Sequence, residues 1–221
     1  MDKNFLLYIN ILLLLAVACQ PTPKEPEALT PTRITIIDSL KHPWSMAFLT
    51  EEEVIVSEKD GNLLRVKLDT KEKFTIQGFP SDLVDSIRVK DGRDNSGIFE
   101  VVCHPDFREN SLVYVSYAAE GVGGSTTQVI RARLENDSLK EVSVILAAQP
   151  YSKDLFHYGG GMTFGSDGKL YVTVGERYYN EIDQPVLPVA QDVMDRRGKI
   201  YRLHPDGSIP EDNPDFGEEA V

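Results

Sequence analysis

The chain has 221 residues, of which 41% are hydrophobic and 26% charged, and its formal net charge is −12. This length and composition are typical of a globular protein with one core of ordinary size or two small ones. A sequence-independent hold on nucleic acid or anionic lipid needs clustered Lys and Arg, so the acidic balance excludes both kinds of partner.

The chain begins with a segment typical of targeting. Residues 1–18 combine Lys3 with an apolar run too short to span a bilayer comfortably, which indicates a signal peptide. The run ends in Leu-Ala-Val-Ala-Cys, which resembles the bacterial lipobox and implies that Cys19 is lipidated. The alternative is an ordinary signal peptide with an incidental cysteine. Residues 19–32 are Pro-rich and predict an extended tether. We therefore expect a bacterial cell-envelope lipoprotein, periplasmic or at the outer membrane, that meets the membrane only through its lipid.

From residue 33 onward, short strands alternate with turns and no helical stripe of useful length appears. The segments Ile55-Val56-Ser57, Tyr114-Val115-Ser116 and Tyr171-Val172-Thr173 recur about 60 residues apart. Each follows an apolar strand and a turn, and each precedes a further strand. Four antiparallel strands per copy are typical of a β-propeller blade. The sequence therefore predicts an all-β chain in which residues 33–221 form a partial β-propeller of about three blades.

The repeat also predicts where the strands lie. Around the three recurring segments, the expected strands are Trp44–Leu49, Asn62–Leu68 and Lys73–Gln77, then Ile98–Cys103, Thr127–Leu134 and Val142–Ala147, and finally Gly160–Phe164 and Lys199–Leu203.

The third copy lacks a predicted outer strand, because residues 207–221 are acidic, contain Pro210 and Pro214 and show no alternating apolar run. A propeller removes its open edges only by closing the ring. We therefore expect the chain to be the N-terminal part of a longer protein, with closure by self-association as the alternative. Residues 28–221 alone should aggregate and be inactive, with hydrogen exchange fastest in 198–221 and slower in 98–134.

The stretch from Phe156 to Arg177 contains the strongest candidate for a site. His157 precedes Tyr158 and three glycines, which sets a titratable ring beside backbone that can adopt positive φ and let a ligand approach. From the residues alone, a structural histidine is the more common alternative.

Other cysteine and histidine residues favour structural roles. Cys103 lies in an apolar run, which favours a small packed side chain over a reactive thiol. His104 and His204 each begin a His-Pro-Asp turn in which the Asp is expected to accept turn amides. His42 is expected to be a packing or surface residue.

Five motifs, taken in order and spacing, resemble the glucose/sorbosone dehydrogenase family. They are PWSMAF at 43–48, SGIFEVVCHPDF at 96–107, HYGG at 157–160, LYVTVGE at 170–176 and GKIYRLHPDGSIPEDNP at 198–214. The family consists of six-bladed propellers, the soluble quinoprotein sugar dehydrogenases, which use pyrroloquinoline quinone (PQQ) and calcium. The resemblance covers about residues 34–216.

The resemblance implies oxidation of an aldose sugar at C1, with hydride transfer to PQQ and onward transfer to an external electron acceptor. It implies His157 as the general base, since imidazole titrates near neutral pH and the sugar hydroxyl must lose its proton as hydride leaves. Asn95 stands where the family usually has a glutamine that touches the quinone, which makes it the cofactor-binding candidate. The family's Arg-Asn clamp on the quinone and its calcium-binding Gly-Pro carbonyls fall beyond Val221, so no metal ligand is assigned within this chain.

The sequence departs from the family at Asn95, at Gly161, where an arginine often follows the glycines, and at Glu176, which replaces the usual Asp. Asn95 and Gly161 keep open a function of another class. That alternative is a non-catalytic propeller that binds carbohydrate or a protein partner at the cell envelope.

Overall fold

A computed structural model describes residues 32–84, 95–177 and 188–215. The chain divides into two units, Met1–Thr35 and Ile36–Val221, and the strands given below belong to the second. The signal peptide 1–18, Cys19 and nearly all of the tether 19–32 lie outside the described residues. Within the described ranges, no helix is long and apolar enough to cross a membrane.

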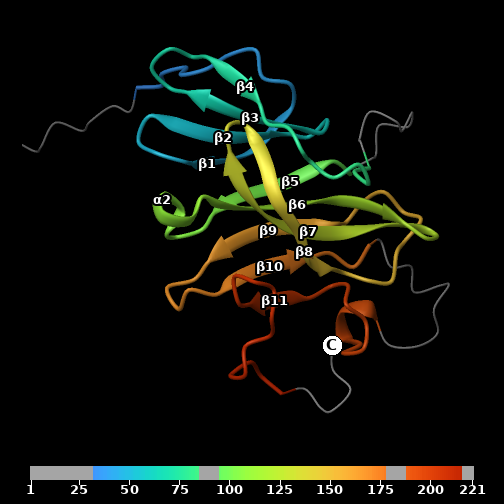
Figure 1. The fold of residues 1–221 in the computed structure, drawn as a ribbon. Helices are drawn as coiled ribbons and strands as arrows, with labels where there is room; N and C mark the ends of the chain where they lie inside the picture. Colours follow the sequence, from blue (N-terminus) through green and yellow to red (C-terminus); the bar gives the residue numbers. More distant parts are fainter. Residues whose placement is uncertain (1–31, 85–94, 178–187, 216–221) are drawn as a thin grey trace, which may run out of the picture. The chain divides into compact units, whose positions relative to one another are not determined.

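Three antiparallel sheets follow one another along the chain and lie side by side (Figure 1). The first contains β1 (Pro43–Phe48), β2 (Glu53–Glu58), β3 (Asn62–Lys67) and β4 (Lys73–Thr75). The second contains β5 (Ile98–Cys103), β6 (Leu112–Gly121), β7 (Gly124–Glu135) and β8 (Ser138–Ala147). The third contains β9 (Gly159–Phe164), β10 (Leu170–Val174) and β11 (Ile200–Leu203). Two short helical segments lie between strands: α2 (Phe107–Asn110) precedes β6, and the 3₁₀ turn η2 (Val189–Gln191) precedes β11.

The sheets confirm the all-β prediction and the order of the repeat. Consecutive strands are neighbours in the sheets of four, four and three strands, which is the arrangement of propeller blades. Within the described residues the third sheet has three strands, in the order β11, β10, β9.

Three strand boundaries were predicted wrongly by two or more residues. β4 ends at Thr75 rather than Gln77, β7 begins at Gly124 rather than Thr127, and β8 begins at Ser138 rather than Val142. The backbone of Gln77 leaves the first sheet, donates to the Asp137 carbonyl and accepts from the Leu139 amide, both at 2.8 Å. Residues that look like the end of one sheet therefore connect it to the next.

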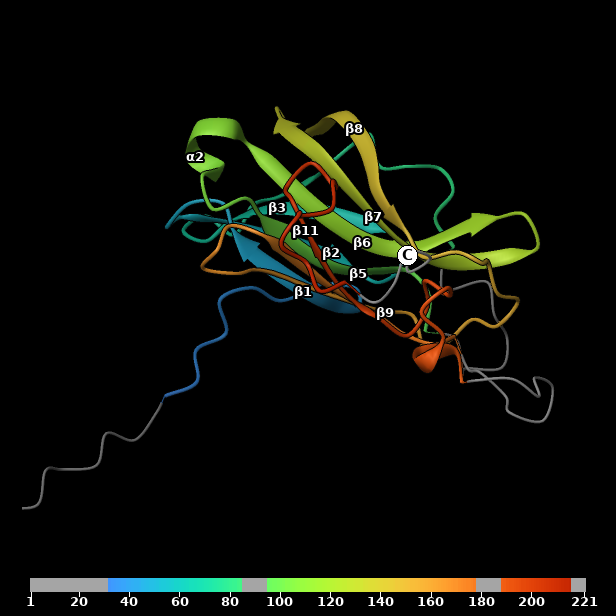
Figure 2. The same ribbon diagram turned by 90° about the horizontal axis from the view of Figure 1, so that it is seen from below.

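The core lies between successive sheets, which overlie one another when seen from below (Figure 2). Side chains alternate along a strand, so the two faces of β6 serve two interfaces. Val113, Val115 and Tyr117 pack against the first sheet, whereas Tyr114 packs against the third. Because both of its faces are buried, β6 is apolar almost throughout.

The first strand has an apolar face that stays open to solvent in this structure. Ala47 packs into the interface with the second sheet, whereas Trp44, Met46 and Phe48 on the opposite face are 56%, 58% and 59% exposed. This face is the one that a neighbouring blade covers in a closed propeller.

An ion-pair network also joins the first two sheets. Arg65 on β3 binds Glu53 at 2.6 Å and Asp137, in the β7–β8 turn, at 2.5 Å. Both carboxylates raise the pKa of Arg65, with the hydrogen bond to Asp137 as the largest cause. The three side chains are partly exposed, so this network contributes modestly to stability.

Cys103 is half-buried and packs against the core, and burial raises its pKa to about 11. A thiol with that pKa holds little thiolate at pH 8, so we expect iodoacetamide to alkylate Cys103 roughly 100-fold more slowly than an unfolded cysteine. The folded state retains the proton more tightly than the unfolded state. The stability that Cys103 contributes is therefore complete below about pH 8.5 and declines as the pH rises toward 11.

Mass spectrometry of the peptide that contains Cys103 measures this alkylation rate in native and in urea-unfolded protein. Equal rates in the two states at pH 8 would show that burial does not protect the thiol.

Candidate functional site

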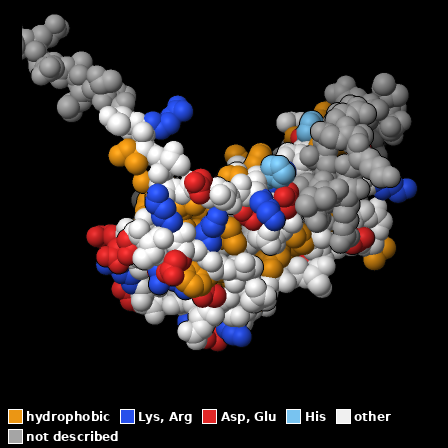
Figure 3. Space-filling model, turned by 90° about the horizontal axis from the view of Figure 1, so that it is seen from above, with side chains coloured by type: hydrophobic (Ala, Val, Ile, Leu, Met, Phe, Trp, Pro, Cys, Tyr) orange, Lys and Arg blue, Asp and Glu red, His pale blue; other side chains and the backbone are white. Residues whose placement is uncertain are grey.

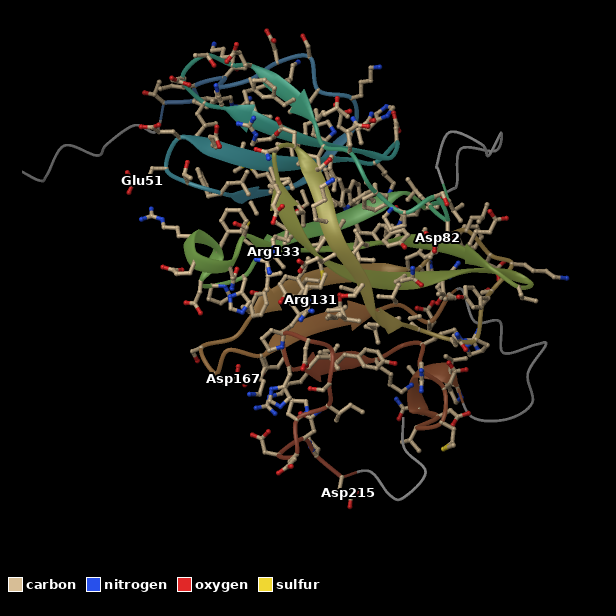
Figure 4. All side chains as sticks on the ribbon, in the orientation of Figure 1. Glu51, Asp82, Arg131, Arg133, Asp167 and Asp215 are labelled. Atoms are coloured by element: carbon tan, nitrogen blue, oxygen red, sulfur yellow. The ribbon has the colours of Figure 1, made fainter. Side chains whose placement is uncertain are left out.

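The turns between strands lie at two opposite ends of the sheets. Glu51 and Asp167, in the turns after β1 and β9, lie on the left of Figure 4, and Asp82 lies on the right. The second end contains the β2–β3 turn and the start of β9, where Gly159 pairs with Val174. His157 precedes β9 and therefore lies at this second end.

His157 is held in a left-handed backbone conformation, with φ of 54°, and its side chain is 50% exposed. Its Nδ1 makes a hydrogen bond with Oε1 of Glu176, two residues beyond the end of β10. A carboxylate oxygen accepts, so Nδ1 carries the proton and the lone pair of the neutral ring lies on Nε2. A non-glycine residue with positive φ is unusual and is enriched at functional sites. This geometry is that of a histidine oriented by an acid.

Backbone contacts fix the His157 loop against the segment that carries Glu176. The Gly175 amide donates to the Tyr158 carbonyl at 2.8 Å, and the Arg177 amide donates to the His157 carbonyl at 3.2 Å. A Cβ on Gly175 would lie 2.0 Å from the His157 carbonyl oxygen. Only glycine allows so close an approach.

We expect Gly175→Ala to destabilise the protein by about 1–3 kcal/mol, because the added methyl group meets backbone that cannot rotate away. Urea denaturation measures the loss. Gly161→Ala is the control, since its Cβ would meet only the Thr173 hydroxyl, at 3.1 Å. Equal losses in the two variants would contradict the close approach.

Arg177 supports the same loop from the interior and is only 1% exposed. Its guanidinium donates to the Ser125 carbonyl at 2.7 Å, to the Phe156 carbonyl at 3.1 Å and to the Asp154 carbonyl. It also lies 3.6 Å from the centre of the Tyr158 ring. Desolvation lowers the Arg177 pKa, yet guanidinium stays charged in proteins. Arg177 therefore binds the carbonyls on either side of Leu155, in the segment that leads into His157.

Asn95 lies on a segment that contacts the His157 loop directly. The main-chain N–H of Asn95 donates to the Leu155 carbonyl at 2.9 Å. Phe99, four residues later, lies against Tyr158 with ring centres 5.2 Å apart. The structure thus brings the segments of the two predicted site residues together, while the third, Cys19, lies outside the described residues.

Lys59 adds a positive charge beside Asn95. Its ammonium donates to the Asn95 side-chain oxygen at 2.7 Å and to its main-chain oxygen at 3.1 Å. The same ammonium lies 4.0 Å from the centre of the Trp44 ring, a cation–π contact. In the view of Figure 3, histidine side chains lie beside acidic and basic side chains. Among the described histidines, His42 pairs with Asp60 at 3.0 Å.

These donors fit an anionic group rich in carbonyl oxygens, such as a carboxylated quinone, because Lys59 and Asn95 offer positive charge and N–H hydrogens. In residues 32–84, 95–177 and 188–215, no group of three or more His, Cys, Asp or Glu side chains could hold a metal ion. We therefore assign no described residue to calcium.

His104 and His204 lie outside this arrangement, each at a turn. Asp206 accepts from the Ser208 amide at 2.9 Å, as predicted for a His-Pro-Asp turn. In the other turn the prediction was wrong, because the His104 ring, rather than the Asp106 carboxylate, accepts the turn amide.

Sequence reasoning missed Lys59 and Arg177, and it did not single out Glu176 from the many carboxylates. The sequence feature that could have identified Glu176 is its position at the end of the LYVTVGE motif, where the family usually has an Asp. Lys59 and Arg177 are recognised only from their contacts, because a single sequence does not distinguish a buried arginine from a solvated one.

Comparisons with known proteins agree on one family. The family model described as Glucose / Sorbosone dehydrogenase matches residues 40–221. An aldose sugar dehydrogenase of Escherichia coli is 28% identical over 188 residues, which cover 83% of this chain and 47% of that protein. Quinoprotein glucose dehydrogenase B of Acinetobacter calcoaceticus is 28% identical over 202 residues, which cover 82% of this chain and 41% of the relative. The chain thus spans less than half the length of these relatives.

A solved structure shows the same fold. The crystal structure of a glucose dehydrogenase superimposes with a TM-score of 0.74 and 33% sequence identity. The match covers 86% of this chain and 52% of that one. The three sheets are therefore blades of a β-propeller.

Proposed function

The chain belongs to the glucose/sorbosone dehydrogenase family, and from this we propose that it forms part of an enzyme that oxidises an aldose sugar at C1 with PQQ as cofactor. The single observation that carries the proposal is the His157–Glu176 pair at the blade end that also contains Asn95 and Lys59. An oriented imidazole is the group that deprotonation of a sugar hydroxyl requires.

In the proposed reaction His157 acts as general base. Its Nε2 takes the proton of the C1 hydroxyl, and the C1–O bond becomes a carbonyl as hydride departs from C1. Glu176 stabilises the imidazolium that forms, and Arg177 keeps the loop from moving away. When bound, PQQ supplies the hydride acceptor, and an external acceptor then receives the electrons.

Asn95 is the residue of this chain that we assign to holding the quinone, through its side-chain amide, and Lys59 places a positive charge beside that amide. Calcium stays an expectation from the family resemblance, and no step is assigned to it.

The experiment that tests the proposal adds PQQ, calcium, a panel of aldoses and an artificial dye to the full-length protein. We expect dye reduction only when PQQ and sugar are both present. Failure of PQQ to bind, with retained carbohydrate or protein binding, would favour the alternative of a non-catalytic propeller. Two departures favour that alternative: Asn95 stands in place of the family's glutamine, and Gly161 stands where an arginine often follows the glycines.

We also propose that Cys19 is lipidated and that the protein is tethered in the bacterial cell envelope. The lipobox-like Leu-Ala-Val-Ala-Cys sequence supports this. Metabolic labelling with a fatty-acid analogue should mark the wild type and not Cys19→Ser. Equal labelling of both would refute it.

A further inference from the structure

Lys59 follows β2, and its backbone is fixed against the segment that carries Asn95. The Ile98 amide donates to the Lys59 carbonyl at 3.4 Å. A Cβ on Gly97 would lie 2.0 Å from that carbonyl oxygen, so the two backbones are in close contact. The Lys59 ammonium therefore stays within reach of the Asn95 side chain.

The chemistry of an ammonium group decides how the Asn95 amide is turned. Lysine has three N–H donors and no acceptor. The Asn95 atom 2.7 Å from Nζ must therefore be the oxygen, and the NH₂ group must point the other way. Asn95 is exposed, and within the described residues its Nδ2 has no protein acceptor. The amide thus offers N–H donors to a ligand.

We propose that Lys59 is a positioning residue that fixes the Asn95 amide as a hydrogen-bond donor toward the cofactor. The ligand atom that meets Asn95 is then an acceptor, a carbonyl or carboxylate oxygen of the quinone. This inference rests on the proposed function.

Lys59 acts through Asn95 rather than as a separate ligand. The Lys59 ammonium donates to both the side-chain and the main-chain oxygen of Asn95, and the Trp44 ring covers a further side of the charge. Loss of the ammonium would let the amide rotate and present its oxygen, which repels an acceptor.

Titration of the PQQ-free, full-length protein with PQQ, in the absence of sugar, tests the inference. We expect Lys59→Met to weaken binding about tenfold, the effect of one hydrogen bond to a charged group. Lys59→Arg should restore binding to within about threefold of the wild type, because guanidinium also only donates. Lys73→Met is the matched control, since the Lys73 ammonium likewise donates to oxygens, the main-chain carbonyls of Asp38 and Ser39, but on β4.

A double-variant comparison separates positioning from direct contact. If Lys59 acts through Asn95, Lys59→Met should weaken binding no further in an Asn95→Ala background. Full additivity of the two losses, or unchanged affinity of Lys59→Met, would overturn the inference.

A second measurement decides the matter if the wild type does not bind PQQ, a result that would refute the proposed function. In PQQ-free protein with ¹⁵N-labelled asparagine, the side-chain NH₂ signals of Asn95 are identified by their loss in Asn95→Ala. They should shift in Lys59→Met and stay in place in Lys73→Met. Signals that do not move in Lys59→Met would overturn the positioning role whatever the cofactor.

Discussion

Replacing His157 with alanine in the full-length protein should lower kcat by about 10²–10⁴-fold, the usual contribution of a positioned general base. The imidazole is the group that takes the C1 hydroxyl proton in the proposed reaction, and Glu176 orients it through Nδ1. Steady-state dye reduction with PQQ and an aldose measures the effect. PQQ affinity should change little, because Asn95 and Lys59 are unaltered.

His42→Ala is the control for this prediction. His42 also pairs with a carboxylate, Asp60, at 3.0 Å, and it is 77% exposed. Its removal should leave kcat within about threefold, since a surface pair of this kind contributes little. Equal losses in the two variants, or undiminished turnover in His157→Ala, would remove His157 from its role.

The repeat could be predicted from sequence most clearly in the middle blade, which is buried on both faces. β5 and β6 are mostly apolar, and the alternation of Val113 and Tyr114 between two interfaces follows from their positions in the strand. The crossing at Gln77 could not be predicted, because its hydrogen bonds to Asp137 and Leu139 depend on how two sheets meet. Periodicity describes one strand at a time and does not report contacts between sheets.

The candidate site was predictable only in part, for a similar reason. His157 and Asn95 were found through motifs, and the structure joins their segments through the Leu155 carbonyl. Lys59 and Arg177 belong to no motif in the sequence, and each acts through oxygens contributed by distant segments. Such contacts depend on the folded backbone, which local sequence does not specify.

Arg177→Met should destabilise the protein by about 3 kcal/mol or more. The guanidinium serves the carbonyls of Ser125, Asp154 and Phe156, and leaving a buried polar group unpaired costs about 1–3 kcal/mol for each group. Urea denaturation measures the change. The variant should also lower kcat, because the same carbonyls hold the loop that presents His157.

Arg133→Met is the matched control. Arg133 is partly exposed, donates to one carbonyl, that of Asn110, and pairs at 3.4–3.6 Å with Glu135 and Glu141. Its loss should cost less than about 1 kcal/mol. Arg177→Lys should fall between the two, because it keeps the charge while one ammonium cannot reach carbonyls on both Ser125 and the His157 loop. If Arg177→Met were no less stable than Arg133→Met, the carbonyls would have other partners, and Arg177 would not be what holds His157 in place.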